Sequence, residues 1–227
     1  MVILVMLVPG YLLIASFTDA QTAHSPKLAV DAWIPLVPAW VLVYGTVYFY
    51  LILVPLLVIQ QADLVERTVR AYLTVWLLSF TGFLLFPTIA PRPEDFEGTG
   101  FAAWGLEFLY QADPPHNCFP SLHVAHSFVS ALAVSRVRQD LGWIAIICAA
   151  LVAVSTLFTK QHFFVDLVAG VLLALFAYAV FLRSYPLSAV TELEHHAAPV
   201  LSGLAGAIAG VSLLAFWLAF QLAKSAP

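Results

Sequence analysis

The stretch CFPSLHVAH, residues 118–126, opens a long apolar segment and yet carries two imidazoles and a hydroxyl. Such groups are rare on lipid-facing helices and usually face the interior of a bundle or a water-filled cavity. A second stretch, KQHFFVD at residues 160–166, has the same character and opens a later apolar segment. We therefore predict a bundle of helices in which the two stretches meet in space and form one reaction centre.

The composition identifies an integral membrane protein. Of the 227 residues 62% are hydrophobic and only 10% are charged, and the mean hydropathy is +0.95. Soluble domains carry roughly 25% charged residues, so this chain has too little charge for a surface that faces water on all sides. Its two cysteines, Cys118 and Cys148, offer no disulfide framework. A net charge of −4 with scattered basic residues argues against nucleic acid as a partner.

Apolar stretches of about 20 residues, long enough to cross a bilayer, predict the fold. Seven such segments span residues 1–17, 38–59, 70–87, 119–136, 141–159, 162–183 and 198–223. The first lacks the basic region of a secretory signal and is interpreted as a spanning helix. The predicted fold class is all-α, a polytopic membrane helical bundle that forms a single domain over residues 1–227.

The longest link between predicted spans covers residues 88–118 and is rich in proline, glycine and acidic residues. Within it, residues 101–110 are predicted to form a short amphipathic helix at the membrane interface. Trp104, Phe108 and Tyr110 suit an anchor at the level of the lipid headgroups.

The basic residues predict the orientation of the bundle. Because successive links lie on opposite sides of the membrane, five basic residues fall on one side and four on the other. Two of these four, Arg92 and Lys160, stand beside the polar stretches and are expected to serve chemistry, which leaves five against two. The positive-inside rule then places the N-terminus in the cytoplasm. Both polar stretches would face the periplasm, the extracellular space or an organelle lumen.

His162 and Asp166 are the first candidates for catalysis. They stand four residues apart, so on a helix they would share one face. A carboxylate can hold an imidazole by one nitrogen and leave the other free to attack an electrophile or take a proton. The alternative is a buried pair that only ties two helices together.

The opening stretch indicates where a phosphate would bind. Pro120 suits the first position of a helix, and the unpaired N–H groups of the first turn, with the Ser121 hydroxyl, form an anion site. His123 would leave the same turn and could protonate a leaving oxygen. His126 is explained at least as well as a core histidine, and we leave it out of the predicted site.

Two cations complete the predicted site. Arg92 lies between prolines at the end of the third span, and its fork of donors matches a phosphate. Lys160 stands two residues before His162. Either cation could instead anchor the chain at the membrane boundary.

These parts predict one reaction class, the attack of a histidine on phosphorus. The predicted catalytic residues are His162 as nucleophile, Asp166 as its partner and His123 as general acid, and the predicted phosphate ligands are Ser121, Arg92 and Lys160. A phosphohistidine would then pass its phosphoryl group to water or to an alcohol. No cofactor or metal ion is needed, because the cations and the helix dipole neutralise the developing charge.

With these residues the chain resembles the type 2 phosphatidic acid phosphatase superfamily, which includes lipid phosphatases and inositol phosphorylceramide synthases. The signatures of that family are Lys-x6-Arg-Pro, Pro-Ser-Gly-His and Ser-Arg-x5-His-x3-Asp. The chain offers Arg92-Pro93, then Pro120-Ser121-Leu122-His123, then Ser155-Thr156-x5-His162-x3-Asp166. The resemblance implies His162 as nucleophile, Asp166 as its partner and His123 as acid.

The resemblance covers roughly residues 40–183. It implies a six-helix phosphatase-like core, with the catalytic part at about 38–183, and makes the helix at about 198–223 additional. The chain departs from the signatures at three positions: Leu85 replaces the Lys, Thr156 the Arg and Leu122 the Gly. Two phosphate-holding cations are thus missing.

The leading functional prediction is a membrane enzyme that acts on a lipid-linked phosphate, most broadly a lipid phosphate phosphatase. Leu122 and the run FVDLVAG at residues 164–170 resemble the inositol phosphorylceramide synthase branch, whose members transfer a phospho-headgroup between lipids. A phosphotransferase with a lipid alcohol as acceptor is therefore the alternative.

Two further readings stay open. One is a metal-dependent hydrolase, with ligands from His123, His126, His162 and Asp166. The other is a non-catalytic lipid-binding or transport protein, whose polar residues would form a pathway. His195 and His196 fall on the opposite side of the predicted bundle and are interpreted as a solvated loop. The sequence does not specify the lipid or the oligomeric state.

Overall fold

The computed structural model describes residues 7–19, 21–93 and 98–225. Over these ranges the chain forms eight α-helices and no β-strand, with two isolated β-bridges, which confirms the all-α prediction. The helices are α2 (Val8–Phe17), α3 (Trp40–Val58), α4 (Ala62–Leu85), α5 (Phe101–Ala112), α6 (Leu122–Val134), α7 (Gln139–Phe158), α8 (Phe164–Ala177) and α9 (Glu192–Ser225).

Within the described residues, five helices are long and apolar enough to cross a membrane. They are α3, α4, α7, α9 and α8, the last counted with the π-helical turn Tyr178–Leu182 that continues it. The predicted first span, residues 1–17, is described only from residue 7 and forms the shorter apolar helix α2; its earlier part lies outside the described residues.

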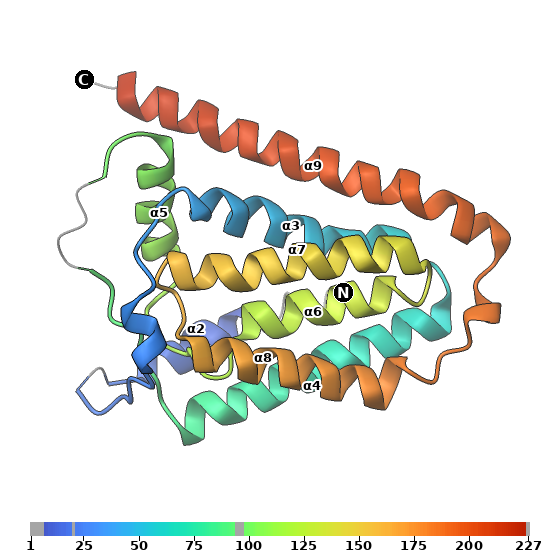
Figure 1. Cartoon of the computed structure of the whole chain (residues 1–227), viewed down its shortest axis with the longest axis horizontal. Helices are drawn as coiled ribbons and strands as arrows, with labels where there is room; N and C mark the ends of the chain where they lie inside the picture. Colours follow the sequence, from blue (N-terminus) through green and yellow to red (C-terminus); the bar gives the residue numbers. More distant parts are fainter. Residues whose placement is uncertain (1–6, 20, 94–97, 226–227) are drawn as a thin grey trace.

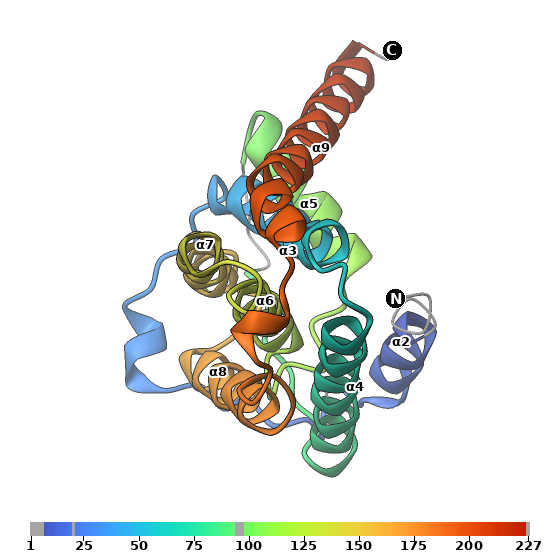
Figure 2. The same cartoon turned by 90° about the vertical axis from the view of Figure 1, so that its right-hand side faces the viewer.

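Helix α6 lies at the centre of the bundle. Seen end-on, it is surrounded by α3, α4, α7 and α8, and it packs against each of them (Figure 2). Helix α2 packs on the outside of α4 (Figure 2), while the long α9 runs along α3 on the far side of the bundle (Figure 1). The small residues Ala125, Ala131 and Ala133 are fully buried on α6, and small residues let helices approach closely.

Helix α6 is shorter than predicted. Its 13 residues rise about 20 Å, less than the roughly 30 Å thickness of a hydrocarbon core. Ser121 is the N-cap, and its hydroxyl oxygen accepts a hydrogen bond from the Val124 N–H at 3.3 Å. Pro120 therefore precedes the cap. The prediction that it is the first residue of the helix is wrong. The polar stretch is a loop that leads into α6.

Two other helices begin earlier than predicted. The charged link before the span at residues 70–87 is already helical from Ala62, because two i,i+4 ion pairs stabilise its exposed turns: Asp63–Arg67 at 3.0 Å and Glu66–Arg70 at 2.5 Å. Helix α9 begins at Glu192. His195 and His196 are therefore helical and exposed, which corrects their interpretation as a loop.

A buried carboxylate holds the start of α9. The Glu194 side chain lies inside the protein, where its Oε1 accepts hydrogen bonds from the N–H groups of Gln60 at 2.9 Å and Gln61 at 3.4 Å. This contact joins α9 to the turn between α3 and α4. The additional helix is thus fixed to the rest of the bundle at the end opposite the polar stretches.

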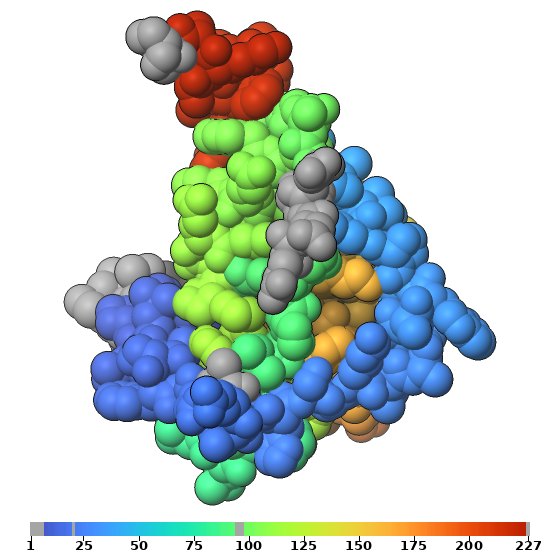
Figure 3. Space-filling view, turned by 90° about the vertical axis from the view of Figure 1, so that its left-hand side faces the viewer, coloured from blue at the N-terminus to red at the C-terminus, as the bar shows by residue number. Residues whose placement is uncertain are grey.

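Backbone hydrogen bonds order the other end of the bundle. The N–H of His24 donates to the Pro87 carbonyl at 2.8 Å, the N–H of Ile89 donates to His24, and the N–H of Ala90 donates to Pro115, each at 2.9 Å. The segment after α4 is therefore held between the N-terminal segment and the segment before α6. Figure 3 shows this face, with the orange residues near the start of α8 in a recess between green and blue segments.

Candidate active site

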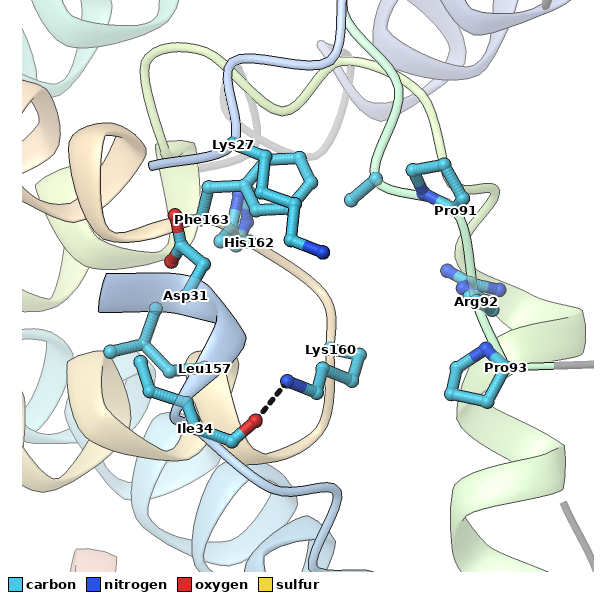
Figure 4. Close-up of a pocket in the computed structure, with 11 residues that line it drawn as sticks. Lys27, Asp31, Ile34, Pro91, Arg92, Pro93, Leu157, Lys160, His162 and Phe163 are labelled. Carbon is cyan, nitrogen blue, oxygen red and sulfur yellow. Dashed lines mark hydrogen bonds between the residues drawn. The ribbon is translucent and has the colours of Figure 1, made fainter. Parts of the chain in front are cut away.

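A cavity of about 240 Å³ opens at this end of the bundle. Its walls come from the N-terminal segment, the segment after α4 and the loop between α7 and α8 (Figure 4). Its lining residues include four of basic or imidazole type: Lys27, Arg92, Lys160 and His162. The two polar stretches of the sequence do meet here, because His162 also contacts residues of the stretch before α6.

His162 stands just before α8, with Phe163 as the N-cap of that helix. Its Nδ1 lies 3.1 Å from the Cys118 carbonyl oxygen and 3.5 Å from Oδ2 of Asp166. Two acceptors at Nδ1 favour the tautomer that carries its proton there, which leaves the lone pair on Nε2. The ring is buried and still lines the cavity.

Asp166 lies in the first turn of α8 and is fully buried. Its Oδ2 accepts a hydrogen bond from the Phe163 N–H at 2.8 Å. The same carboxylate therefore caps the helix and faces His162. The predicted contact between these two residues is present, but the predicted helical face is wrong. His162 precedes the helix, and Asp166 reaches back to it.

His123 lies on the other side of His162. Its Nδ1 is 3.4 Å from Nε2 of His162, and its ring packs against Tyr44 and Tyr48 of α3, with ring centroids 5.4 and 5.2 Å away. His123 is therefore next to the atom that would attack phosphorus. It does not line the cavity itself.

Ser121 does not reach the cavity. It is completely buried, its hydroxyl caps α6, and its N–H donates to the Asp166 carbonyl at 3.1 Å. Because α6 begins at Leu122, two residues later than predicted, Ser121 caps the helix and joins α6 to α8. Of the three predicted phosphate ligands, Arg92 and Lys160 line the cavity beside His162, and Ser121 does not.

Arg92 is fixed by contacts on several sides. Its guanidinium donates to the carbonyls of Tyr110 and Asp113 and, at 3.1 Å, to Oε1 of Gln161, and it lies 4.3 Å from the centroid of the Tyr110 ring. Its Nε is buried and has no partner among the described residues. Burial lowers the pKa of Arg92, although a guanidinium stays charged at neutral pH.

Tyr110 also contacts the site. Its hydroxyl donates to the Thr159 carbonyl at 2.9 Å, and its ring faces Arg92, so it supports the wall of the cavity. Trp104 and Phe108 pack against Phe216 of α9, with ring centroids 6.5 and 5.4 Å away.

Lys160 adopts a left-handed backbone conformation, with φ of 55°. Its ammonium donates to the Ile34 carbonyl at the cavity wall, a contact visible in Figure 4. Burial lowers the pKa of Lys160, the charge of Asp31 raises it, and the charge of Lys27 lowers it further. An anion in the cavity would relieve the repulsion between the two lysines.

Sequence reasoning missed Lys27 and Asp31, which both line the cavity. They belong to the first link, where no spacing relates them to the polar stretches. Gln161, which belongs to the second polar stretch, accepts a hydrogen bond from Arg92, a role that the sequence did not predict.

The four residues named as ligands for a metal-dependent hydrolase do not form one cluster in the described part of the chain. His126 is buried on α6, and its ring stacks on Tyr72 at a centroid distance of 4.4 Å, away from the cavity. No three histidine, cysteine or acidic side chains in the described part of the chain lie close enough to hold a metal ion.

Comparison with known proteins identifies the family of the chain. The model of the PAP2 superfamily matches residues 18–180, and the chain belongs to that superfamily. A PA-phosphatase related-family protein of Dictyostelium discoideum is 27% identical over 117 residues, which cover 47% of this chain and 21% of that protein. The match therefore spans about a fifth of the relative's length. No solved structure matches the chain significantly.

The structure also locates two departures from the signatures. Leu85, at the position of the signature Lys, ends α4 and is 80% exposed. Thr156, at the position of the signature Arg, is completely buried, and its hydroxyl donates to the Ala153 carbonyl at 2.7 Å. Neither residue lines the cavity. The positive charge of this pocket comes from other positions.

Proposed function

We propose that this protein hydrolyses a lipid-linked phosphate through a phosphohistidine intermediate at His162. The observation that carries the proposal is the environment of that ring. Nδ1 faces Cys118 and Asp166, while Nε2 faces His123 beside a cavity that contains Arg92 and Lys160. One nitrogen is thus held and the other is available for attack.

The reaction divides into two transfers. In the first, Nε2 of His162 attacks phosphorus, the bond between phosphorus and the lipid oxygen breaks, and His123 in its protonated form gives a proton to that oxygen. In the second, neutral His123 takes a proton from water, whose oxygen attacks phosphorus and releases His162. Asp166 stabilises the positive charge that the His162 ring acquires in each transition state.

The charges of the pocket suit a phosphoryl group. Arg92 and Lys160 approach the cavity from two different segments, and Figure 4 shows them around the same opening. Fixed cations placed where negative charge develops stabilise a transition state without reorganisation. These two residues support phosphoryl transfer without a requirement for a metal ion.

Transfer to a lipid alcohol is the second candidate. It is favoured by the sequence at Leu122 and at residues 164–170, which resembles the synthase branch of the superfamily. In that reaction the hydroxyl of an acceptor lipid replaces water in the second step. The same phosphohistidine would serve both outcomes.

The test uses purified full-length protein with a labelled lipid phosphate or phosphodiester, assayed with and without a diacylglycerol-like or ceramide-like acceptor. We expect release of labelled phosphate, and loss of at least about a thousandfold in turnover for His162→Ala, because the nucleophile is removed. His196→Ala, on an exposed turn at the opposite end of the bundle, should retain full activity.

Full activity of His162→Ala would exclude the phosphohistidine. Movement of the label to the acceptor instead of water would assign the transferase reaction. No turnover on any lipid phosphate or phosphodiester, with intact folded protein, would favour the non-catalytic lipid-binding or transport reading.

A further inference from the structure

Lys27 is a third cation of the pocket, and neither the polar stretches nor the family signatures include it. It belongs to the N-terminal segment, lies across the cavity entrance from the segment of Arg92, and is exposed. Figure 4 shows its side chain over the same opening that Lys160 and Arg92 border.

Asp31 positions the segment that carries Lys27. This carboxylate is buried, and each of its oxygens accepts one backbone hydrogen bond: Oδ1 from the Phe164 N–H at 2.8 Å and Oδ2 from the Leu28 N–H at 2.7 Å. Phe164 is the first residue of α8. Asp31 therefore joins the residue next to Lys27 directly to the helix start behind His162.

The three cations differ in what they already bind. Arg92 donates to three oxygens and Lys160 donates to the Ile34 carbonyl. The ammonium of Lys27 has no hydrogen-bond or ion-pair partner within the described ranges of the chain. Its three donors are therefore available to a ligand that enters the cavity.

The described lining residues carry a net positive charge. Three cations stand against the single carboxylate of Asp31, a difference of two positive charges when His162 is not counted. Asp31 raises the pKa of Lys160, but one carboxylate does not balance three cations. A phosphate monoester, which carries up to two negative charges near neutral pH, matches this charge better than a singly charged diester.

We infer that Lys27 binds substrate phosphate and that, with Lys160 and Arg92, it makes the pocket selective for phosphate monoesters over diesters. This inference rests on the proposed function, since it concerns the same site. Lys27 and Lys160 then supply the two positive charges that Leu85 and Thr156 do not. These two cations of the chain come from loops. The signatures instead place their cations at positions 85 and 156, which lie in α4 and α7.

The test measures anion binding, which needs no turnover. Inorganic phosphate and dimethyl phosphate are titrated separately into full-length protein in detergent at about pH 8, and binding is followed by phosphorus NMR. We expect Lys27→Ala to weaken phosphate binding about tenfold, the size of one charge-assisted contact at a partly solvated site. Binding of dimethyl phosphate should change less than about threefold.

Two control variants test whether the effect depends on a positive charge at position 27. Lys27→Arg keeps the positive charge and should bind phosphate within about threefold of the parent chain. Lys224→Ala removes a lysine near the end of α9 that does not line the cavity, and it should leave both titrations unchanged. Equal thermal unfolding midpoints for all variants show that each protein is folded.

Unchanged phosphate binding in Lys27→Ala, an equal loss for both anions, or no saturable phosphate binding by the parent chain would each overturn the inference. These outcomes are separable from a failure of the proposed function. Selective loss of phosphate binding in Lys27→Ala supports the inference whatever the turnover of His162→Ala. Retained turnover in His162→Ala rejects only the assignment of His162 as nucleophile.

Discussion

His162 is defined by what each of its nitrogens faces. An isolated imidazole exchanges its proton between two nitrogens, whereas here Nδ1 has the Cys118 carbonyl at 3.1 Å and Asp166 at 3.5 Å. The carbonyl is the closer acceptor, so the tautomer does not depend on the carboxylate alone. The carboxylate adds a negative charge, which matters most when the ring becomes positive during phosphoryl transfer.

Asp166→Asn separates these two contributions. The asparagine oxygen can still accept from the Phe163 N–H, which lies 2.8 Å from the carboxylate, so the cap of α8 should survive. We expect turnover to fall about 10²- to 10⁴-fold, because the charge that stabilises the positive ring is lost. Steady-state kinetics on the substrate found in the labelled assay measure the effect, and circular dichroism checks the helix content.

Asp63→Asn is the matched control for this prediction. Asp63 pairs with Arg67 on an exposed turn of α4, where its side chain is 60% exposed, and such pairs contribute little. Its turnover should equal that of the parent chain. An Asp166→Asn protein with turnover within about threefold of the parent would contradict the role given to the carboxylate.

The site depends on how closely α6 and α8 approach. His123 belongs to α6 and His162 immediately precedes α8, so the 3.4 Å between their ring nitrogens is set by the contact between the two helices. Gly170 permits that contact. A Cβ at this position would lie 2.7 Å from the Ser121 carbonyl oxygen and 3.1 Å from Cβ of Val124.

Gly170→Ala should therefore separate the two helices. Its methyl group meets backbone, which cannot move as a flexible side chain can, and overpacking of this kind costs about 1–3 kcal/mol. We expect a lower thermal unfolding midpoint and, because His123 moves away from His162, a loss of turnover larger than the loss of folded protein. Thermal unfolding in detergent and kinetics on the folded fraction measure both.

Gly203 offers the comparison within the same protein. It lies in α9, and a Cβ there meets nothing within 4 Å, so Gly203→Ala should be neutral or stabilising by up to about 1 kcal/mol. If Gly170→Ala unfolds at the same temperature as Gly203→Ala and keeps full turnover, the close approach of α6 and α8 is not required.

At the scale of the helices, the sequence predicted which segments are helical better than it predicted where each helix begins. Apolar length predicted α3, α7 and α8 within a few residues, since hydropathy reports which residues avoid water. It did not predict that α6 begins after Ser121 or that α8 begins after His162, because a cap is set by hydrogen bonds from residues such as Asp166. Lys27 and Asp31 escaped prediction because their place at the pocket is set by tertiary contacts of the N-terminal segment.

At the scale of the whole molecule, the positive charges separate along the bundle. The end opposite the cavity carries five arginines, Arg67, Arg70, Arg136, Arg138 and Arg183, and the cavity end carries four basic residues, Lys27, Arg92, Lys160 and Lys224. Three of these four line the cavity. Only Lys224 then remains as a basic residue outside the pocket at that end, which strengthens the contrast used by the positive-inside rule.

This contrast predicts that the cavity faces the periplasm, the extracellular space or a lumen, and single cysteines can test it. In a background with Cys118→Ser and Cys148→Ser, Thr99→Cys places a thiol at an exposed position before α5, and His196→Cys places one on the exposed start of α9. A membrane-impermeant maleimide added to intact cells that expose the outer face should label Thr99→Cys at once. It should label His196→Cys only after permeabilisation, because the five arginines predict that this end faces the cytoplasm. The reverse pattern would place the cavity in the cytoplasm and would restrict the proposed reaction to lipid phosphates of the inner leaflet.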